Sequence, residues 1–220
     1  TYGALMAGVF AHAVGTSVQE YVAEHVVGPA GGGFAFGARS EGERAALAAL
    51  SFSPPMLTEA QANGIASGQA IQDGAMLPIM QDAPGFFGDP RVQAAAWPAM
   101  SGVGTARSVA RVLNGALGFG GSRILDDEAL AGMIAERRHG MDRMLGHVSR
   151  FGSGVELPHG FMPYFGGRSF GHQGAGGSVA AADPDTGLVL VYTSTHTAST
   201  VGGSDQAVVL MAAARQLIGA

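Results

Sequence analysis

The sequence contains neither cysteine nor lysine. Without cysteine, this chain has no disulfide framework, no thiolate nucleophile and no Cys-ligated zinc. All twelve basic residues are arginine, so a mechanism that needs a lysine base must obtain it from outside these 220 residues. Asparagine occurs only at Asn63 and Asn114.

Charged residues are also scarce, at 13%, and the net charge is −5. No basic stripe is present that would bind phosphates, so nucleic acid is not an expected partner. No apolar run approaches the roughly 20 residues of a membrane span, and the opening residues Thr1 to Ala4 lack the basic residue that begins a signal peptide. The 47% hydrophobic content predicts a soluble, globular chain with a sizeable core.

Several familiar site patterns are absent. The histidines are dispersed and none forms a His-x-x-x-His pair, so the sequence predicts no metal site. The segments Gly102-x-Gly104 and Gly174-x-Gly176 are interpreted as turns, because neither lies in a strand–glycine loop–helix unit with an acidic partner. No Gly-x-Ser-x-Gly elbow occurs. Neither a metal nor an organic cofactor is expected.

The first 30 residues predict a pair of helices. Residues 4–14 are apolar almost all round, which is typical of a buried helix, and Gly15 suits its C-terminal cap. Ser17 and Glu20 have capping-box spacing for a second helix, which Gly28-Pro29 would end.

Residues 31–100 predict a loop-rich segment, with short helices near 41–50 and 58–68. Long irregular connections often form substrate-binding walls, and this one lacks the composition of a disordered spacer. Trp97 is the candidate substrate-binding side chain here; it could wall an apolar pocket or pack in the core, together with its apolar neighbours Phe86, Phe87 and Pro98.

The remainder predicts helices, then strands, then a helix. Residues 101–140 should hold a helix capped by Thr105 and another over 126–138, which is acidic at its start and has Arg137, Arg138 and His139 at its end. Residues 141–200 predict antiparallel strands near 145–156, 168–173, 177–183 and 187–195, with a hairpin turn at 183–187. Residues 204–220 form the expected last helix. The fold class is α+β.

The stretch from Ser169 to Ser178, SFGHQGAGGS, followed by a strand, a turn and a strand, resembles the third signature of the β-lactamase-like serine hydrolases. That family includes class C β-lactamases, D-aminopeptidases and carboxylesterases, and its signature triplet lies on the strand beside the active site. The start, Thr1-Tyr2-Gly3, resembles the residues that follow the family's catalytic tyrosine in the esterase branch. The resemblance implies a β-lactamase/transpeptidase-like domain, with this chain as its C-terminal portion.

The same resemblance implies roles for individual residues. The backbone N–H of Ala175 would be one donor of an oxyanion hole, and His172 would stabilise charge near the leaving group or the substrate. Gln173, Gly174 and Gly176 would contact the substrate, since glycines let it approach the backbone closely. The family's Ser-x-x-Lys and catalytic tyrosine are not in this chain and would come from a preceding segment of the same domain.

The leading hypothesis is therefore a serine acyl hydrolase, with carboxylesterase as its first candidate activity, that acts on a small ester or amide through an acyl-enzyme. The alternatives are a β-lactamase or D-aminopeptidase, a non-catalytic binding or assembly subunit of the same fold, and a hydrolase in which Thr1 is an N-terminal nucleophile. The sequence before Thr1 would separate these hypotheses.

Overall fold

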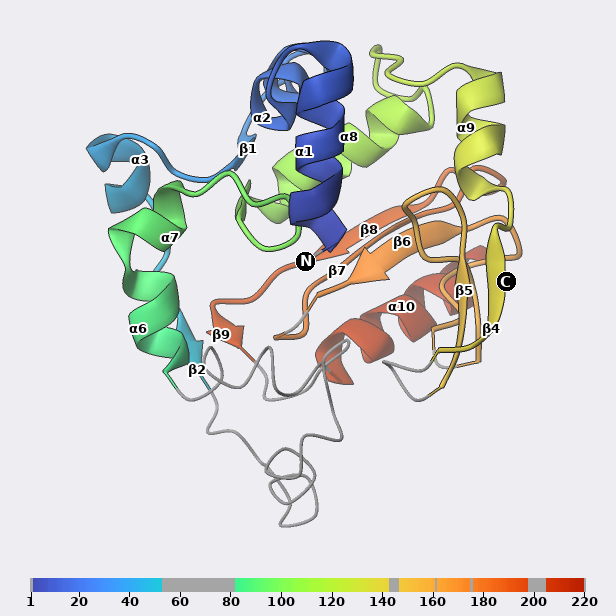
Figure 1. Ribbon diagram of the computed structural model, residues 1–220. Helices are drawn as coiled ribbons and strands as arrows, with labels where there is room; N and C mark the ends of the chain where they lie inside the picture. Colours follow the sequence, from blue (N-terminus) through green and yellow to red (C-terminus); the bar gives the residue numbers. More distant parts are fainter. Residues whose placement is uncertain are drawn as a thin grey trace.

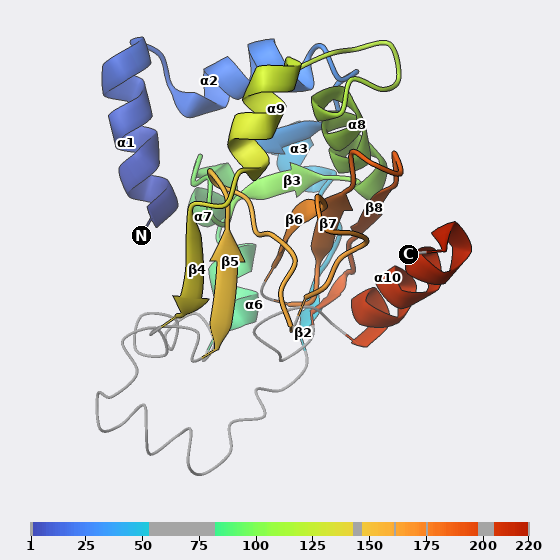
Figure 2. The ribbon, with the colours of Figure 1, turned by 90° about the vertical axis from the view of Figure 1, so that its right-hand side faces the viewer.

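An antiparallel sheet of three strands lies at the centre of the molecule, with helices on both faces (Figures 1 and 2). This computed structural model describes residues 2–52, 82–142, 147–160, 162–174, 176–197 and 205–219. The strands are β6 (Phe170–Gln173), β7 (Val179–Ala182) and β8 (Val189–Tyr192), in the order β6-β7-β8. The predicted α+β class and the antiparallel arrangement are confirmed.

The β7–β8 hairpin has the turn that its sequence predicts. Asp183 accepts a hydrogen bond from the backbone N–H of Asp185 at 2.9 Å. Gly187 adopts a φ of 72°, in the left-handed region that glycine tolerates, and donates its N–H to the carbonyl of Asp183. The turn fixes the register that pairs Ala182 with Val189.

Beyond β6 the sheet continues through a single residue. Strands β4 (Arg138–Met141) and β5 (Val148–Phe151) pair with each other. Glu156 forms isolated bridges to Phe151 of β5 and to Gly171 of β6, and so joins the two ladders. At the opposite edge, β8 pairs with β7 and with no other strand of the described chain.

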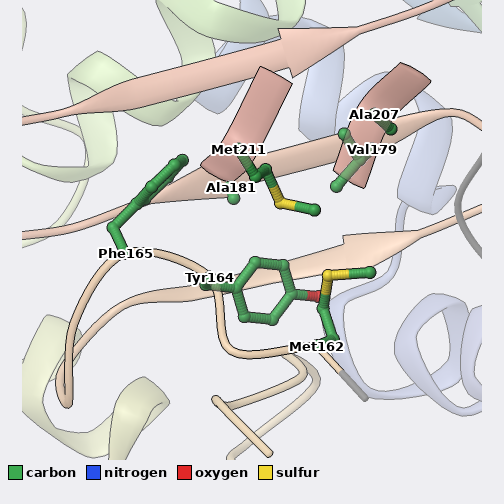
Figure 3. Close-up of a cluster of buried hydrophobic side chains, with 7 residues drawn as sticks. All are labelled: Met162, Tyr164, Phe165, Val179, Ala181, Ala207 and Met211. Carbon is green, nitrogen blue, oxygen red and sulfur yellow. The ribbon is translucent and has the colours of Figure 1, made fainter. Parts of the chain in front are cut away.

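Helix α10 (Asp205–Ile218) covers one face of the sheet, as Figures 1 and 2 show. Its Ala207 and Met211 pack against Val179 and Ala181 of β7. Three residues from the segment before β6 complete this core: Met162, Tyr164 and Phe165 (Figure 3). The predicted C-terminal helix is therefore confirmed, with its buried stripe on the sheet.

The other face is covered by α8 (Ala106–Ala116) and α9 (Asp127–Ile134). Thr105 caps α8 as predicted, accepting a hydrogen bond from the backbone N–H of Ser108. The buried cluster on this face comprises Leu117, Leu130, Leu157, Phe170 and Ala182.

The prediction of a helix over 126–138 is wrong at its C-terminal end. Helix α9 ends at Ile134, and Arg138 and His139 belong to β4. The backbone N–H of Arg137 donates to the carbonyl of Phe151. Pairing with β5 therefore replaces a further helical turn, since tertiary hydrogen bonding outweighs local helix propensity.

At the N-terminus, α1 (Tyr2–Val14) is followed by α2 (Val18–Val22) and a π-helical turn, η1 (Ala23–Val27). The capping box of Ser17 and Glu20 is present. The expectation that the first helix is buried is wrong for the described chain, because none of its residues is buried and Leu5 is 64% exposed. The helix stands at the margin of the molecule, where no described element covers its outer face (Figure 2).

The segment between the helix pair and α8 consists of short elements. Strand β1 (Phe34–Phe36) pairs with β3 (Gly102–Gly104), and β2 (Ser51–Phe52) pairs with β9 (His196–Thr197). The helices are α3 (Glu41–Ala45), α6 (Ala83–Gly88) and α7 (Pro90–Ala94). The helix predicted near 41–50 is thus shorter than expected, and the one near 58–68 lies outside the described residues. Within the described residues, no helix is long and apolar enough to cross a bilayer.

Candidate active site

A pocket of about 720 Å³ lies beside the sheet, between the short elements of residues 44–104 and the ends of β7 and β8. Its walls are mainly apolar and include Leu50, Phe52, Phe86, Phe87 and Trp97. Trp97 therefore lies at a pocket, one of the two positions that the sequence left open, and the predicted contact with a substrate stays a prediction. The indole Nε1 of Trp97 is buried and finds no hydrogen-bond partner among the residues that the structure describes.

Polar groups enter this pocket from the sheet. Ser178 and Thr193, the residues next to the paired ends of β7 and β8, both line it. Gly102, Gly104 and Thr105 line it from the approach to α8. The pocket thus combines an apolar wall with hydroxyl groups and backbone, the usual composition of a small-molecule site.

His172 lies on the same face of the sheet as Ser178. Side chains alternate along a strand, so His172 shares its face with Phe170, which packs beneath α8 and α9. It pairs across the ladder with Ala180, two residues from Ser178. His172 is exposed, with the Phe151 ring 6.4 Å from its own. Among the described residues, however, the lining of the pocket does not include His172 itself.

The imidazole of His172 is oriented by the backbone of the next residue. Its Nδ1 lies 2.5 Å from the carbonyl oxygen of Gln173. A carbonyl only accepts hydrogen bonds, so Nδ1 carries the proton and Nε2 of the neutral ring has the free lone pair. This arrangement leaves Nε2 as the accepting nitrogen of the neutral ring.

The loop after β6 is organised around its backbone. The N–H of Gly174 donates to the carbonyl of Ser178 at 2.8 Å, so it is not available to an oxyanion. Ala175, the predicted oxyanion donor, lies outside the described residues, and its role stays a prediction.

The other predicted substrate contacts are placed differently from His172. Gln173 lies on the opposite face of β6, the α10 side, by strand alternation. Gly176 has a φ of 89°, and a Cβ at that position would collide with the side chain of Thr197. A glycine is therefore required at residue 176 by the packing of this chain, whatever contact it makes with a substrate. None of the three predicted residues Gln173, Gly174 and Gly176 is among the described residues that line the pocket.

The structure also brings together residues that the sequence did not connect. The hydroxyl of Ser51 lies 2.9 Å from Nδ1 of His196, where β2 pairs with β9. The neighbouring residues Leu50, Phe52 and Thr195 line the pocket, so this pair lies at its rim. The two residues are 145 positions apart and carry no local signature, so only the fold reveals the contact. As to metals, no group of three His, Asp or Glu side chains suited to an ion occurs in the described part of the chain.

Comparison with known proteins agrees with this geometry. The family model described as beta-lactamase matches residues 1–215. Among curated proteins, the chain is 39% identical over 100 residues to the esterase/beta-lactamase LipL of Mycobacterium tuberculosis, an alignment that covers 42% of this chain and 22% of LipL.

Solved structures give the same result over nearly the whole chain. EstA from Arthrobacter nitroguajacolicus Rue61a has a TM-score of 0.81 at 26% identity, covering all of this chain and 58% of EstA. A family VIII carboxylesterase has a TM-score of 0.74 at 25% identity, covering 96% of this chain and 55% of the other. A penicillin-binding protein homologue from Caulobacter crescentus has the same fold, with a TM-score of 0.72 at 23% identity, covering 97% of this chain and 57% of that one. The chain therefore spans little more than half the length of these structures.

Proposed function

The chain belongs to the β-lactamase family, and from that premise we propose that the complete protein is a serine acyl hydrolase, with carboxylesterase as its leading activity. The observation that carries the proposal is the position of His172. It lies on the strand whose sequence resembles the family's third signature, on the sheet face that Ser178 shares, and Nε2 of its neutral ring can accept a proton or a hydrogen bond. The similarity to EstA and to a carboxylesterase favours ester chemistry.

In the proposed mechanism, a serine hydroxyl attacks the substrate carbonyl, the ester or amide bond breaks, and the alcohol or amine leaves with the proton that the serine gave up. Water then hydrolyses the acyl-enzyme, which releases the acid and restores the serine. The nucleophile and its base belong to a Ser-x-x-Lys motif, which residues 1–220 do not contain because they include no lysine. The catalytic tyrosine likewise lies in a preceding segment of the domain. That segment is the proposed partner of this chain, which supplies the strand, His172 and much of the pocket.

Two groups of this chain would act on the developing charge. The backbone N–H of Ala175 would donate to the oxyanion of the tetrahedral intermediate, next to the N–H of the nucleophilic serine. His172 would stabilise charge at the leaving group or at a polar group of the substrate. Trp97 and its aromatic neighbours favour a substrate with an apolar acyl or alcohol part.

The full-length protein, expressed with its upstream segment, tests this assignment. Saturable hydrolysis of p-nitrophenyl acetate, with kcat/KM well above that for nitrocefin, is the expected result. Preference for nitrocefin would make the protein a β-lactamase. An upstream sequence without Ser-x-x-Lys, together with inactivity on both substrates and on D-amino-acid amides, would favour the non-catalytic subunit.

Residues 1–220 alone provide the second half of the test. They should not hydrolyse either substrate above background, because the Ser-Lys pair is absent. Saturable turnover by this fragment would contradict the mechanism and place a nucleophile inside it. Ser51 is then one candidate, since its hydroxyl contacts an imidazole in the way that an activated nucleophile does. Thr1, the N-terminal candidate, is the other, and Ser51→Ala and Thr1→Ala distinguish them.

A further inference from the structure

Glu156 lies directly against the strand that carries His172. Its backbone N–H donates to the carbonyl of Gly171 at 2.9 Å, and its carbonyl accepts from the N–H of Gly171 at 3.0 Å. These two hydrogen bonds lie on the edge of β6 that faces away from β7. Within the described segment between β5 and β6, they are the only pairing with that edge. Together with the pairing to β7, Glu156 therefore fixes the position of Gly171, the residue immediately before His172.

The side chain of Glu156 is held in turn by two buried neighbours. Its Oε1 lies 2.8 Å from Nε2 of His159, and its Oε2 accepts a hydrogen bond from the Tyr164 hydroxyl. The side chains of Glu156 and His159 are 5% and 2% exposed, and Tyr164 is fully buried. A carboxylate so deeply buried needs all of these partners, since water cannot replace them.

Tyr164 is well suited to be a permanent donor in this network. Burial, followed by the charge of Glu156, raises the pKa of its phenol far above the ordinary value, so the hydroxyl keeps its proton at any pH at which an enzyme works. Its backbone has a φ of 44°, a left-handed conformation that non-glycine residues rarely adopt. The ring packs beneath β7 and α10 (Figure 3), which holds this strained residue in place.

We propose that Glu156, His159 and Tyr164 are positioning residues, which fix the outer edge of β6 and thereby the place of His172 beside the substrate. The inference rests on the proposed function, because it assigns catalytic work to β6. The three residues do not touch the substrate. They act through the backbone pair of Glu156 and Gly171, at a distance of one residue from His172.

The test compares Glu156→Ala with Glu156→Gln in the full-length protein. Alanine removes both side-chain hydrogen bonds, whereas glutamine keeps an oxygen for Tyr164 and offers its amide to His159. With Glu156→Ala, kcat should fall about 10- to 100-fold while KM changes less than about threefold, because a misplaced catalytic group slows the chemical step. Glu156→Gln should stay within about threefold of the wild type. Both are assayed well below their melting temperatures.

Asp183→Asn is the matched control. Asp183 is a buried carboxylate in the β7–β8 turn, away from the outer edge of β6, and its loss should lower the melting temperature without lowering kcat. A folded Glu156→Ala variant with the kcat of this control would overturn the proposal, as would a Glu156→Gln variant as impaired as Glu156→Ala. If Glu156→Ala does not fold, Tyr164→Phe, which removes one hydroxyl, is judged by the same criterion.

A measurement independent of turnover separates this proposal from the proposed function. The imidazole nitrogen signals of His172, identified by their loss in His172→Gln, are recorded for each variant. If the wild type hydrolyses nothing, the proposed function fails. Positioning is then still supported if the His172 signals move in Glu156→Ala and not in Asp183→Asn, and it is overturned if they stay fixed in both.

Discussion

The proton on Nδ1 of His172 restricts what this residue can do. Because the Nδ1–H group donates to the carbonyl of Gln173, the neutral ring can accept a hydrogen bond only through Nε2. In the protonated ring, Nε2–H can donate one. The same nitrogen can therefore take a proton at one step and return it at another. This behaviour suits a group beside the leaving atom of an acyl transfer.

Replacing His172 by alanine in the complete enzyme should lower kcat/KM by about 10- to 1000-fold, the effect of removing a positioned proton-handling or charge-stabilising group. Stability should change little, because the side chain is exposed. Kinetics and melting temperature are measured together, with His172→Gln as the variant that keeps a polar group. Near-normal activity of His172→Ala would show that His172 has no catalytic role, and loss of folding would show that it has a structural one.

Ala175 is predicted to act through its main chain, so the substitution that matters is the one that removes the N–H. Ala175→Pro should lower kcat about 100-fold or more, whereas Ala175→Ser should keep most activity. Circular dichroism and melting curves must show that both variants fold. A folded, fully active proline variant would place the oxyanion donor at another residue.

Apart from Trp97, the site residues predicted from the sequence all lie within one local motif. His172 could be located because its neighbours from Ser169 to Ser178 form a recognisable string. The Ser51–His196 contact joins two segments that meet only in the folded chain. The network of Glu156, His159 and Tyr164 is local in sequence, but its meaning depends on the bridge to Gly171, which sequence spacing does not reveal.

At the scale of elements, the short helices α6 and α7 form part of the pocket wall. Each begins at an aspartate whose side chain caps its first turn. Asp89 caps α7, accepting from the backbone N–H of Arg91 at 2.8 Å, and also pairs with the Arg91 guanidinium. The hydrogen bonds from the Arg91 side chain and backbone lower the pKa of Asp89 from 3.8 to about 2. Val92 and Gln93 of α7 line the pocket near Trp97.

The wall should therefore loosen in acid. Because the folded pKa of Asp89 lies below its unfolded value, the stabilisation is complete above pH 3.8 and is lost as the pH falls toward 2. Trp97 is the only tryptophan of this chain, so its emission, taken as the difference from Trp97→Phe, should shift over that interval. Asp89→Asn keeps a capping oxygen but does not titrate, and its shift should be smaller. Identical titrations of the two proteins would contradict this role for Asp89.

Elements were predictable where a local signal determines them. The caps at Ser17 and Thr105 and the hairpin turn at 183–187 are each local hydrogen-bonding patterns, and all are present. The C-terminal end of α9 was not predictable, because β5 competes for the backbone of Arg137. The exposure of α1 could not be predicted from its composition. An apolar composition indicates that a helix packs against a partner, but it does not say whether that partner is among the described residues.

At the scale of the whole molecule, two observations bear on the proposed upstream segment: the share of the solved structures that this chain covers, and its exposed apolar surface. The chain spans 55 to 58% of those structures. Its large exposed apolar side chains include Leu5 and Val9 of α1 and Val209 and Leu217 of α10. Apolar side chains gathered on helix faces that no described element covers are typical of a surface that another segment covers.

The outer edge of β8, which no strand within residues 2–52, 82–142, 147–160, 162–174, 176–197 and 205–219 pairs with, gives this chain the capacity for β-augmentation. Because Asp183 and Leu188 form a hydrogen-bonded pair, alternation directs the backbone N–H groups of Val189 and Val191 away from β7. Neither a charge nor a proline protects this edge. We expect residues 1–220 alone to self-associate through it, and the upstream half, added as a separate polypeptide, to compete and complement in trans.

Two proline variants check this with light scattering coupled to size exclusion. Val191→Pro removes an outward donor and should suppress self-association while the hairpin persists. Leu190→Pro removes a bond of the β7 ladder instead and should unfold the hairpin. If Val191→Pro associates as the unaltered chain does, the contact lies elsewhere. If it does not, the edge of β8 mediates the self-association. Under the proposed function the upstream segment should then compete for this same edge, and two separately inactive polypeptides should regain activity when they are mixed.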